Sequence, residues 1–375
     1  MLPLFAVNAV IMMAAALALW LSGAYPPQLA AHVAFALGVL PLILAAIAYF
    51  VPVLTRGDGA PRPLQGTALA AWAGGALIAA GFAGILPQPE AAAAAAAAAG
   101  TATLTLIAWI ARRAGRSLGQ PHPGLAWYLA ALGFLAAALA AVPLMFWWPE
   151  QRQALRLFHL HANLLGFVGL TSIGTLQVLL PTAAGRPDPR AAARLRADLK
   201  FAVAGAALTA VGAAWSLPLA IVGAVLFLIP LVRMGWHWLA AFPERIGSRH
   251  GAAPALAAAG AGVIILVLAG IGHAVGVLSG RDAVAGFVAA FLLPLVTGAA
   301  TQLLPVWLRP GLKLPWHDKV REALGRHALL RSLFMVAGGI IAALGHPSGL
   351  WLAAAGVALF AVALITALRT KKNPG

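Results

Sequence analysis

Residues 158–181, FHLHANLLGFVGLTSIGTLQVLLP, form an apolar stretch that is long enough to cross a lipid bilayer. The stretch nevertheless contains two histidines, an asparagine and a glutamine. An unsatisfied polar group in hydrocarbon costs several kcal/mol, so a helix that faces lipid would not keep these residues. We therefore expect them to face a protein interior, a cofactor or a water-filled cavity.

The spacing of this stretch occurs three times in the chain, and we call this spacing the repeated frame. Each copy begins at one residue and reaches a proline twenty positions later, and the three copies begin at His32, His161 and Ala285. Internal repeats indicate an architecture that is built from repeated units. We expect a single transmembrane domain, residues 1–375, with four-helix repeats at about 1–113, 123–240 and 252–369.

Composition places the chain in a membrane. It is 62% hydrophobic and only 9% charged, whereas a soluble domain is about 25% charged. A spanning helix needs about 20 apolar residues. By that measure the sequence predicts an all-α integral membrane protein with twelve transmembrane helices, in three pseudo-symmetric four-helix arcs. The expected segments are 2–23, 27–54, 65–87, 90–113, 123–146, 155–182, 198–216, 217–240, 252–279, 282–308, 326–346 and 349–369.

The basic residues that give the chain its net charge of +16 lie mostly in the predicted loops. Nearly all Lys and Arg residues lie in loops after even-numbered segments, and loops after odd-numbered segments hold only Arg152, Arg156 and Arg281. The positive-inside rule then places both termini in the cytoplasm. We expect a multi-pass protein of a bacterial-type inner membrane, with the lipid bilayer as its partner and no nucleic acid.

The predicted orientation divides the histidines into two groups. His32, His159, His161 and His273 fall inside predicted helices in the outer half of the membrane. This layer is the candidate metal or cofactor site, since a chain with no cysteine must hold such a group with other side chains. The remaining histidines are expected to be loop or helix-end residues: His122, His237, His250, His317, His327 and His346.

Neutral imidazole within a helix bundle is a ligand for haem iron and for copper. His159 and His161 are two positions apart, so they point about 200° apart around a helix. They are expected to serve two sites on opposite sides of that helix. Covalent attachment of a c-type haem needs cysteine, so the expected cofactor is haem b, in one or two copies, with copper as an alternative at a second site.

Two further groups of residues have two interpretations each. Arg152 and Arg156 either pair with haem propionates or are ordinary interfacial arginines. The glycines near the histidines either make room for a haem or allow close packing of helices. These glycines are Gly38, Gly166, Gly169 and Gly174.

The nine acidic residues all fall in predicted loops or at predicted helix ends. A proton relay normally places a carboxylate within the membrane. Proton pumping is therefore not expected.

At the His-x-His pair and its proline the chain resembles the tenth helix of haem–copper oxidase subunit I. The twelve helices and the repeat frame also resemble that family, and His32 corresponds to a low-spin haem ligand on its second helix. Nitric-oxide reductase large subunits and NnrS-type membrane proteins are similar as well. The resemblance implies a bis-histidine haem held by His32 and His161, with His159 and His273 at a second site. A redox partner, such as a cytochrome subunit, is also expected, and the sequence leaves open whether the protein is an oligomer.

The chain departs from that family in ways that bear on activity. The His-x-His pair is on the sixth segment instead of the tenth, and residues 198–216 contain no histidine pair for copper. The expected role is therefore electron transfer or handling of nitric oxide or dioxygen, with oxidoreductase activity left open. The alternatives are an NnrS-like nitric-oxide response without turnover, and a transporter or cofactor-free scaffold.

Overall fold

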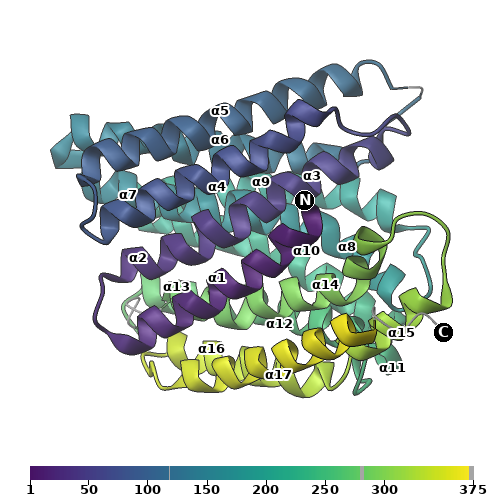
Figure 1. Cartoon of the computed structure of the whole chain (residues 1–375). Coiled ribbons are helices and arrows are strands. Elements are labelled where there is room, and N and C mark those ends of the chain that lie inside the picture. The colour runs from purple at the N-terminus through teal and green to yellow at the C-terminus, as the bar shows by residue number, and fades with distance from the viewer. Residues whose placement is uncertain (118, 279–282, 371–375) are drawn as a thin grey trace. The chain divides into compact units, whose positions relative to one another are not determined.

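The computed structural model describes residues 1–117, 119–278 and 283–370, and every regular element in these ranges is a helix (Figure 1). Eleven of the described helices are long and apolar enough to cross a membrane, and a bent pair of shorter helices makes a twelfth if the pair is counted as one span. These findings confirm an all-α protein of the multi-pass membrane class. Arg281, which the topology argument used, lies outside the described residues.

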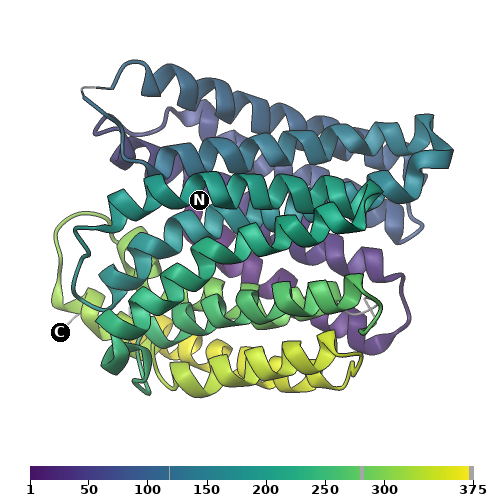
Figure 2. The same cartoon turned by 180° about the vertical axis from the view of Figure 1, so that it is seen from behind.

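The elements run in the following order along the chain (Figures 1 and 2). They are α1 (Leu2–Ser22), α2 (Pro27–His32), η1 (Val33–Val39), α3 (Leu40–Leu54), α4 (Arg62–Phe82), α5 (Gln88–Ala114), α6 (Gly124–Trp147), η2 (Pro149–Gln151), α7 (Arg152–His161), η3 (Ala162–Gly169), α8 (Leu170–Ala183), α9 (Ala191–Trp215), α10 (Leu217–Ala241), α11 (Pro243–Ile246), α12 (Ala253–Ala274), α13 (Ala283–Phe287), η4 (Val288–Leu292), α14 (Leu293–Leu308), α15 (Pro315–Leu324), α16 (Ala328–Ala343) and α17 (Gly349–Thr370).

The helices group into two compact units. The first unit holds residues 25–177 and 189–230, and the second holds residues 2–24, 178–188 and 231–375. The candidate histidines on α2 and α7 belong to the first unit. The single domain and its three four-helix repeats stay predictions.

Most of the predicted segments agree with the helices to within three residues. The segments expected over 65–87 and 252–279 extend five residues beyond the helix ends, which are at Phe82 and Ala274. The helix expected over 198–216 begins at Ala191, because its first two turns are polar and escape a hydropathy window. The helix expected over 326–346 is α16, whose 16 residues span only about 24 Å. That is short of a bilayer core of about 30 Å. Counted together with α15, which meets it at a bend of 41°, it would be a twelfth span.

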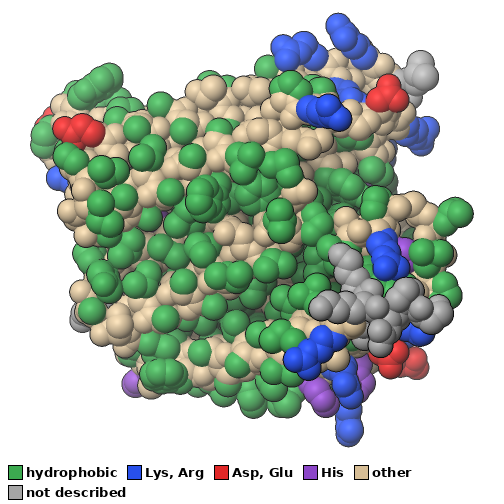
Figure 3. Space-filling view, in the orientation of Figure 1, with side chains coloured by type: hydrophobic (Ala, Val, Ile, Leu, Met, Phe, Trp, Pro, Cys, Tyr) green, Lys and Arg blue, Asp and Glu red, His purple; other side chains and the backbone are tan. Residues whose placement is uncertain are grey.

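Side chains on the helix surfaces match a membrane environment. In each unit, hydrophobic side chains cover the middle of the helices, and Lys, Arg, Asp and Glu gather near helix ends (Figure 3). Large exposed side chains on this surface include Leu4, Ile11, Leu104 and Val362. Such exposure would be costly in water, and it is expected where lipid is the solvent.

A π-helical turn interrupts each of the three helices that share the repeated frame. The turn η1 follows His32, η3 follows His161, and η4 begins three residues after Ala285. π-helical turns are rare and are frequent at functional sites. Pro41 follows η1 and Pro294 follows η4, yet η3 has no such proline after it. Proline is therefore not the common cause of these turns.

Glycines bring other helices close to these turns. A Cβ at Gly75 of α4 would lie 2.5 Å from the carbonyl oxygen of Ala36 in η1. Beside the second turn, Gly166 faces the Phe134 ring and Gly169 faces the Phe227 ring. Further along α8, Gly174 faces Trp127. These three glycines make room for aromatic side chains of neighbouring helices, which favours the packing interpretation for them.

A buried arginine crosses the bend between α15 and α16. Arg331 is fully buried, and its guanidinium donates to the carbonyl oxygens of Leu324 at 2.6 Å and Arg326 at 3.1 Å. Its Cζ also lies 5.0 Å from the centre of the Phe360 ring. These donors satisfy carbonyls at the end of α15, which lack partners within their own helix.

We expect Arg331→Met to destabilise the protein by leaving these carbonyls unpaired, at about 1–3 kcal/mol for each buried group. Thermal unfolding of the purified protein in detergent measures the effect. Arg326→Met is the matched control, since Arg326 is exposed in the same turn. Equal melting temperatures for the two variants would show that Arg331 does not hold the bend.

Candidate functional site

His32 is the last residue of α2, directly before the π-helical turn η1. Its Nδ1 lies 2.8 Å from the carbonyl oxygen of Gln28, one turn earlier in the helix. A carbonyl only accepts, so Nδ1 carries the proton and Nε2 carries the lone pair. The ring lies against Phe82 of α4, with 4.7 Å between ring centres.

His161 has the same local arrangement. It is the last residue of α7, directly before η3, and its Nδ1 donates to the carbonyl oxygen of Leu157 over 2.9 Å. The donor again belongs to Nδ1, so Nε2 is the nitrogen with the lone pair. Donation of one ring N–H to a carbonyl is what fixes the tautomer of a metal-ligating histidine. Both histidines of the repeated frame thus have the form that an axial ligand needs.

His159 is held differently. Its Nδ1 donates across to the carbonyl oxygen of Ala138 on α6 over 2.8 Å. Its Nε2 accepts from the amide Nδ2 of Asn163 over 3.3 Å, and that amide also donates to the His159 carbonyl. Both ring nitrogens of His159 are therefore engaged. Sequence reasoning noted Asn163 as a polar residue but did not predict this contact, because helical spacing alone does not reveal it.

The structure brings histidines of two helices into one region of the first unit. His159 lies near enough to His32 for the two rings to interact electrostatically. Among the residues that the structure describes, no group of three or more His, Asp or Glu side chains is placed to hold a metal ion. The structure thus relates His32 to His159, and a cofactor shared by His32 and His161 stays a prediction.

His273 belongs to the second unit, where it is exposed at the end of α12. Its Nδ1 donates to the Leu278 carbonyl over 2.9 Å, which caps the helix end. The part of His273 in a second metal site stays a prediction. Arg152 and Arg156 are exposed in the first turns of α7, and Arg152 lies over the Phe146 ring at 5.6 Å. Their pairing with propionates also stays a prediction.

The third copy of the frame is closed by packing. Ala285, in the place of the histidines, is 1% exposed. A Cβ on the next residue, Gly286, would lie 2.8 Å from the carbonyl oxygen of Gly339 on α16. In η4 the backbone of Ala290 lies against Gly262 of α12. This helix therefore has no histidine at the first position of the frame, and α16 and α12 pack closely against it beside its π-helical turn.

One acidic residue corrects the expectation that all nine lie in loops or at helix ends. Asp198 is inside α9, seven residues after its first residue, and is 0% exposed. Gln177 of α8 is also buried and donates to the carboxylate over 3.5 Å. The misplaced start of the helix hid this carboxylate from sequence reasoning.

Polar side chains within the helices mostly bond to their own backbone. The hydroxyls of Thr171, Ser172 and Thr297 each donate to the carbonyl four residues earlier. Side chains that line a transport path would instead point into a cavity. The chain also stays helical through Pro41, Pro230 and Pro294. The transporter alternative stays a prediction.

No family model matches the chain, and a search of curated proteins likewise found no match.

Proposed function

We propose that this protein binds a b-type haem through His32 and His161 and acts in electron transfer or in the handling of nitric oxide or dioxygen. The observation that carries the proposal is the matched hydrogen bonding of these two histidines. Each lies before a π-helical turn at the same place in the repeated frame, and each donates Nδ1–H to the carbonyl four residues earlier. Both Nε2 atoms then carry the lone pair that iron binds.

The surroundings of His32 and His161 support this assignment. The Phe82 ring packs on His32 and helps to exclude water, and the bond to Gln28 holds the ring orientation. Arg152 and Arg156 lie at the start of α7, where they would pair with carboxylates of a bound cofactor. When bound, a bis-histidine haem supplies one-electron transfer and has no open coordination position.

The proposal includes the larger arrangement. The three frame helices would be the second members of three four-helix arcs, with both termini in the cytoplasm of a bacterial-type cell. The closed packing at Ala285 and Gly286 supports a cofactor beside the first two frame helices rather than the third. An oxygen-reducing haem–copper centre is not part of this proposal, since the first unit offers no cluster of copper ligands among its described residues.

A reduced-minus-oxidised spectrum of the purified protein tests the proposal. We expect a Soret band and the narrow reduced bands of a six-coordinate haem b. A colourless protein, purified from cells with ample haem, would refute it. Consumption of nitric oxide with an electron donor then separates the two roles: rapid turnover indicates catalysis at a second site, and its absence indicates electron transfer or binding without turnover.

A further inference from the structure

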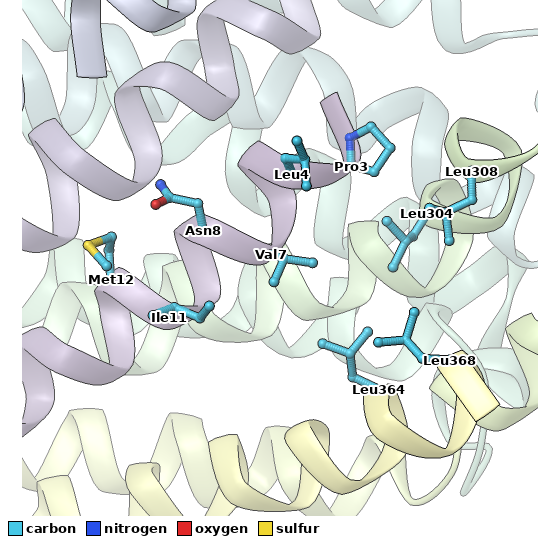
Figure 4. A pocket seen from close by; sticks show the side chains of 10 residues that line it. All are labelled: Pro3, Leu4, Val7, Asn8, Ile11, Met12, Leu304, Leu308, Leu364 and Leu368. Atoms are coloured by element: carbon cyan, nitrogen blue, oxygen red, sulfur yellow. The ribbon is translucent and has the colours of Figure 1, made fainter. Parts of the chain in front are cut away.

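The second unit contains an apolar groove between α1, α14 and α17, with a volume of about 470 Å³. Ten residues of the three helices line it (Figure 4). Leu304 of α14 is buried at its floor, whereas Leu4 of α1 is 74% exposed and Leu368 of α17 is 46% exposed at its rim. The groove is therefore open to the surroundings of the helices.

The depth of the groove matches one leaflet of a bilayer. On α1 its lining runs from Pro3 to Met12, which is about 14 Å along the helix axis. Half of a hydrocarbon core is about 15 Å thick. The volume also lies within the range of about 300–1,000 Å³ that is typical of sites for small ligands. An acyl chain of one leaflet has the shape and polarity that this space requires.

Positive charge lies at one end of the groove. Leu308 and Leu368 line that end, and each is followed directly by an arginine, Arg309 and Arg369. The guanidinium of Arg309 lies 4.3 Å from the centre of the Trp316 ring, which holds it in place. Arg369 is exposed in the last turn of α17. A ligand with an apolar chain and an anionic head would complement this arrangement along its whole length.

We propose that the groove binds an anionic phospholipid, with one acyl chain between α1 and α17 and its phosphate against Arg369 and Arg309. By the predicted topology these arginines are cytoplasmic, so the lipid comes from the inner leaflet. This proposal stands on the second unit alone and does not depend on haem binding.

Native mass spectrometry of the purified protein tests the proposal, with dioleoylphosphatidylglycerol and dioleoylphosphatidylcholine as probes. We expect the protein to retain the anionic lipid in preference to the zwitterionic one. Arg369→Gln should lower retention of the anionic lipid about fivefold, the effect of one basic residue near an anionic membrane surface. The matched control is Arg116→Gln, which removes an exposed arginine after α5, outside the groove.

A second pair of variants tests the chain-binding part of the groove. Leu364→Trp fills the space and should lower retention of both lipids. Leu359→Trp adds the same bulk at an exposed position of α17 outside the groove and should have no effect. Equal retention of the two lipids by the unaltered protein would overturn the proposal. So would a Leu364→Trp variant that keeps its lipid, or one that only abolishes a dimer, which would assign the groove to a second copy of the chain.

Discussion

Replacing His32 or His161 with alanine is expected to abolish haem binding. Loss of a supporting contact to a metal ligand already costs about 10–100-fold in affinity, so loss of the ligand itself should lower haem content at least tenfold. Absorbance at the Soret maximum per protein, together with a pyridine haemochrome assay, measures this effect. Each change removes one axial nitrogen, and either one alone should suffice.

The control for this experiment is His250→Ala. His250 is exposed in the second unit, where its Nδ1 accepts from the backbone N–H of His327. The His250→Ala substitution should leave the haem absorption spectrum unchanged. His159→Ala is informative in a different way, because both nitrogens of that ring are already engaged. If His159→Ala removes the haem and His161→Ala does not, the two histidines have exchanged the roles proposed for them.

Adding one methyl group at Gly262 is expected to destabilise the second unit strongly. A Cβ at this position would lie 2.0 Å from the carbonyl oxygen of Ala290 in the π-helical turn η4. The atom that the Cβ would meet belongs to the backbone, which cannot rotate away as a side chain can. Gly262→Ala must therefore push α12 away from η4, at a cost of about 1–3 kcal/mol for overpacking.

Gly270→Ala is the matched control on the same helix. No atom lies within 4 Å of the added Cβ there, so the substitution should only raise helix propensity, by about 0.5–1 kcal/mol. The two variants thus differ in the sign of their effect. Thermal unfolding in detergent measures both, and a Gly262→Ala protein as stable as the Gly270→Ala protein would contradict the packing of η4 described above.

Much of the fold follows from hydropathy along the chain. Twelve apolar segments were expected, and the described residues form eleven long apolar helices and one bent pair. The segment expected over 90–113 includes the alanine run 91–99, and it forms the 27-residue helix α5. Mean hydropathy is a sum over residues that are neighbours in the sequence, so it locates apolar helical segments well. It missed the start of α9, whose first two turns are polar, and it did not reveal the bend between α15 and α16.

The candidate site was predicted only in part. The repeated spacing singled out His32 and His161, and their hydrogen bonds are local, each to a carbonyl four residues away. The partner of His159 is 21 residues away on another helix. The contact of Asp198 with Gln177 likewise joins two helices. Contacts of this kind depend on which helices pack together, and no pattern within one helix specifies them.

The sequence by itself determined the membrane class, the helices and the repeated frame that contains His32 and His161. These features arise from apolar surface and spacing along one helix, which are local properties of the chain. Only the tertiary structure decided that the third frame helix is closed, that Asp198 is buried and that π-helical turns follow the histidines. The physical reason is that a helix in lipid satisfies its backbone hydrogen bonds within itself. Burial and close approach depend instead on which neighbouring helix packs against its small residues.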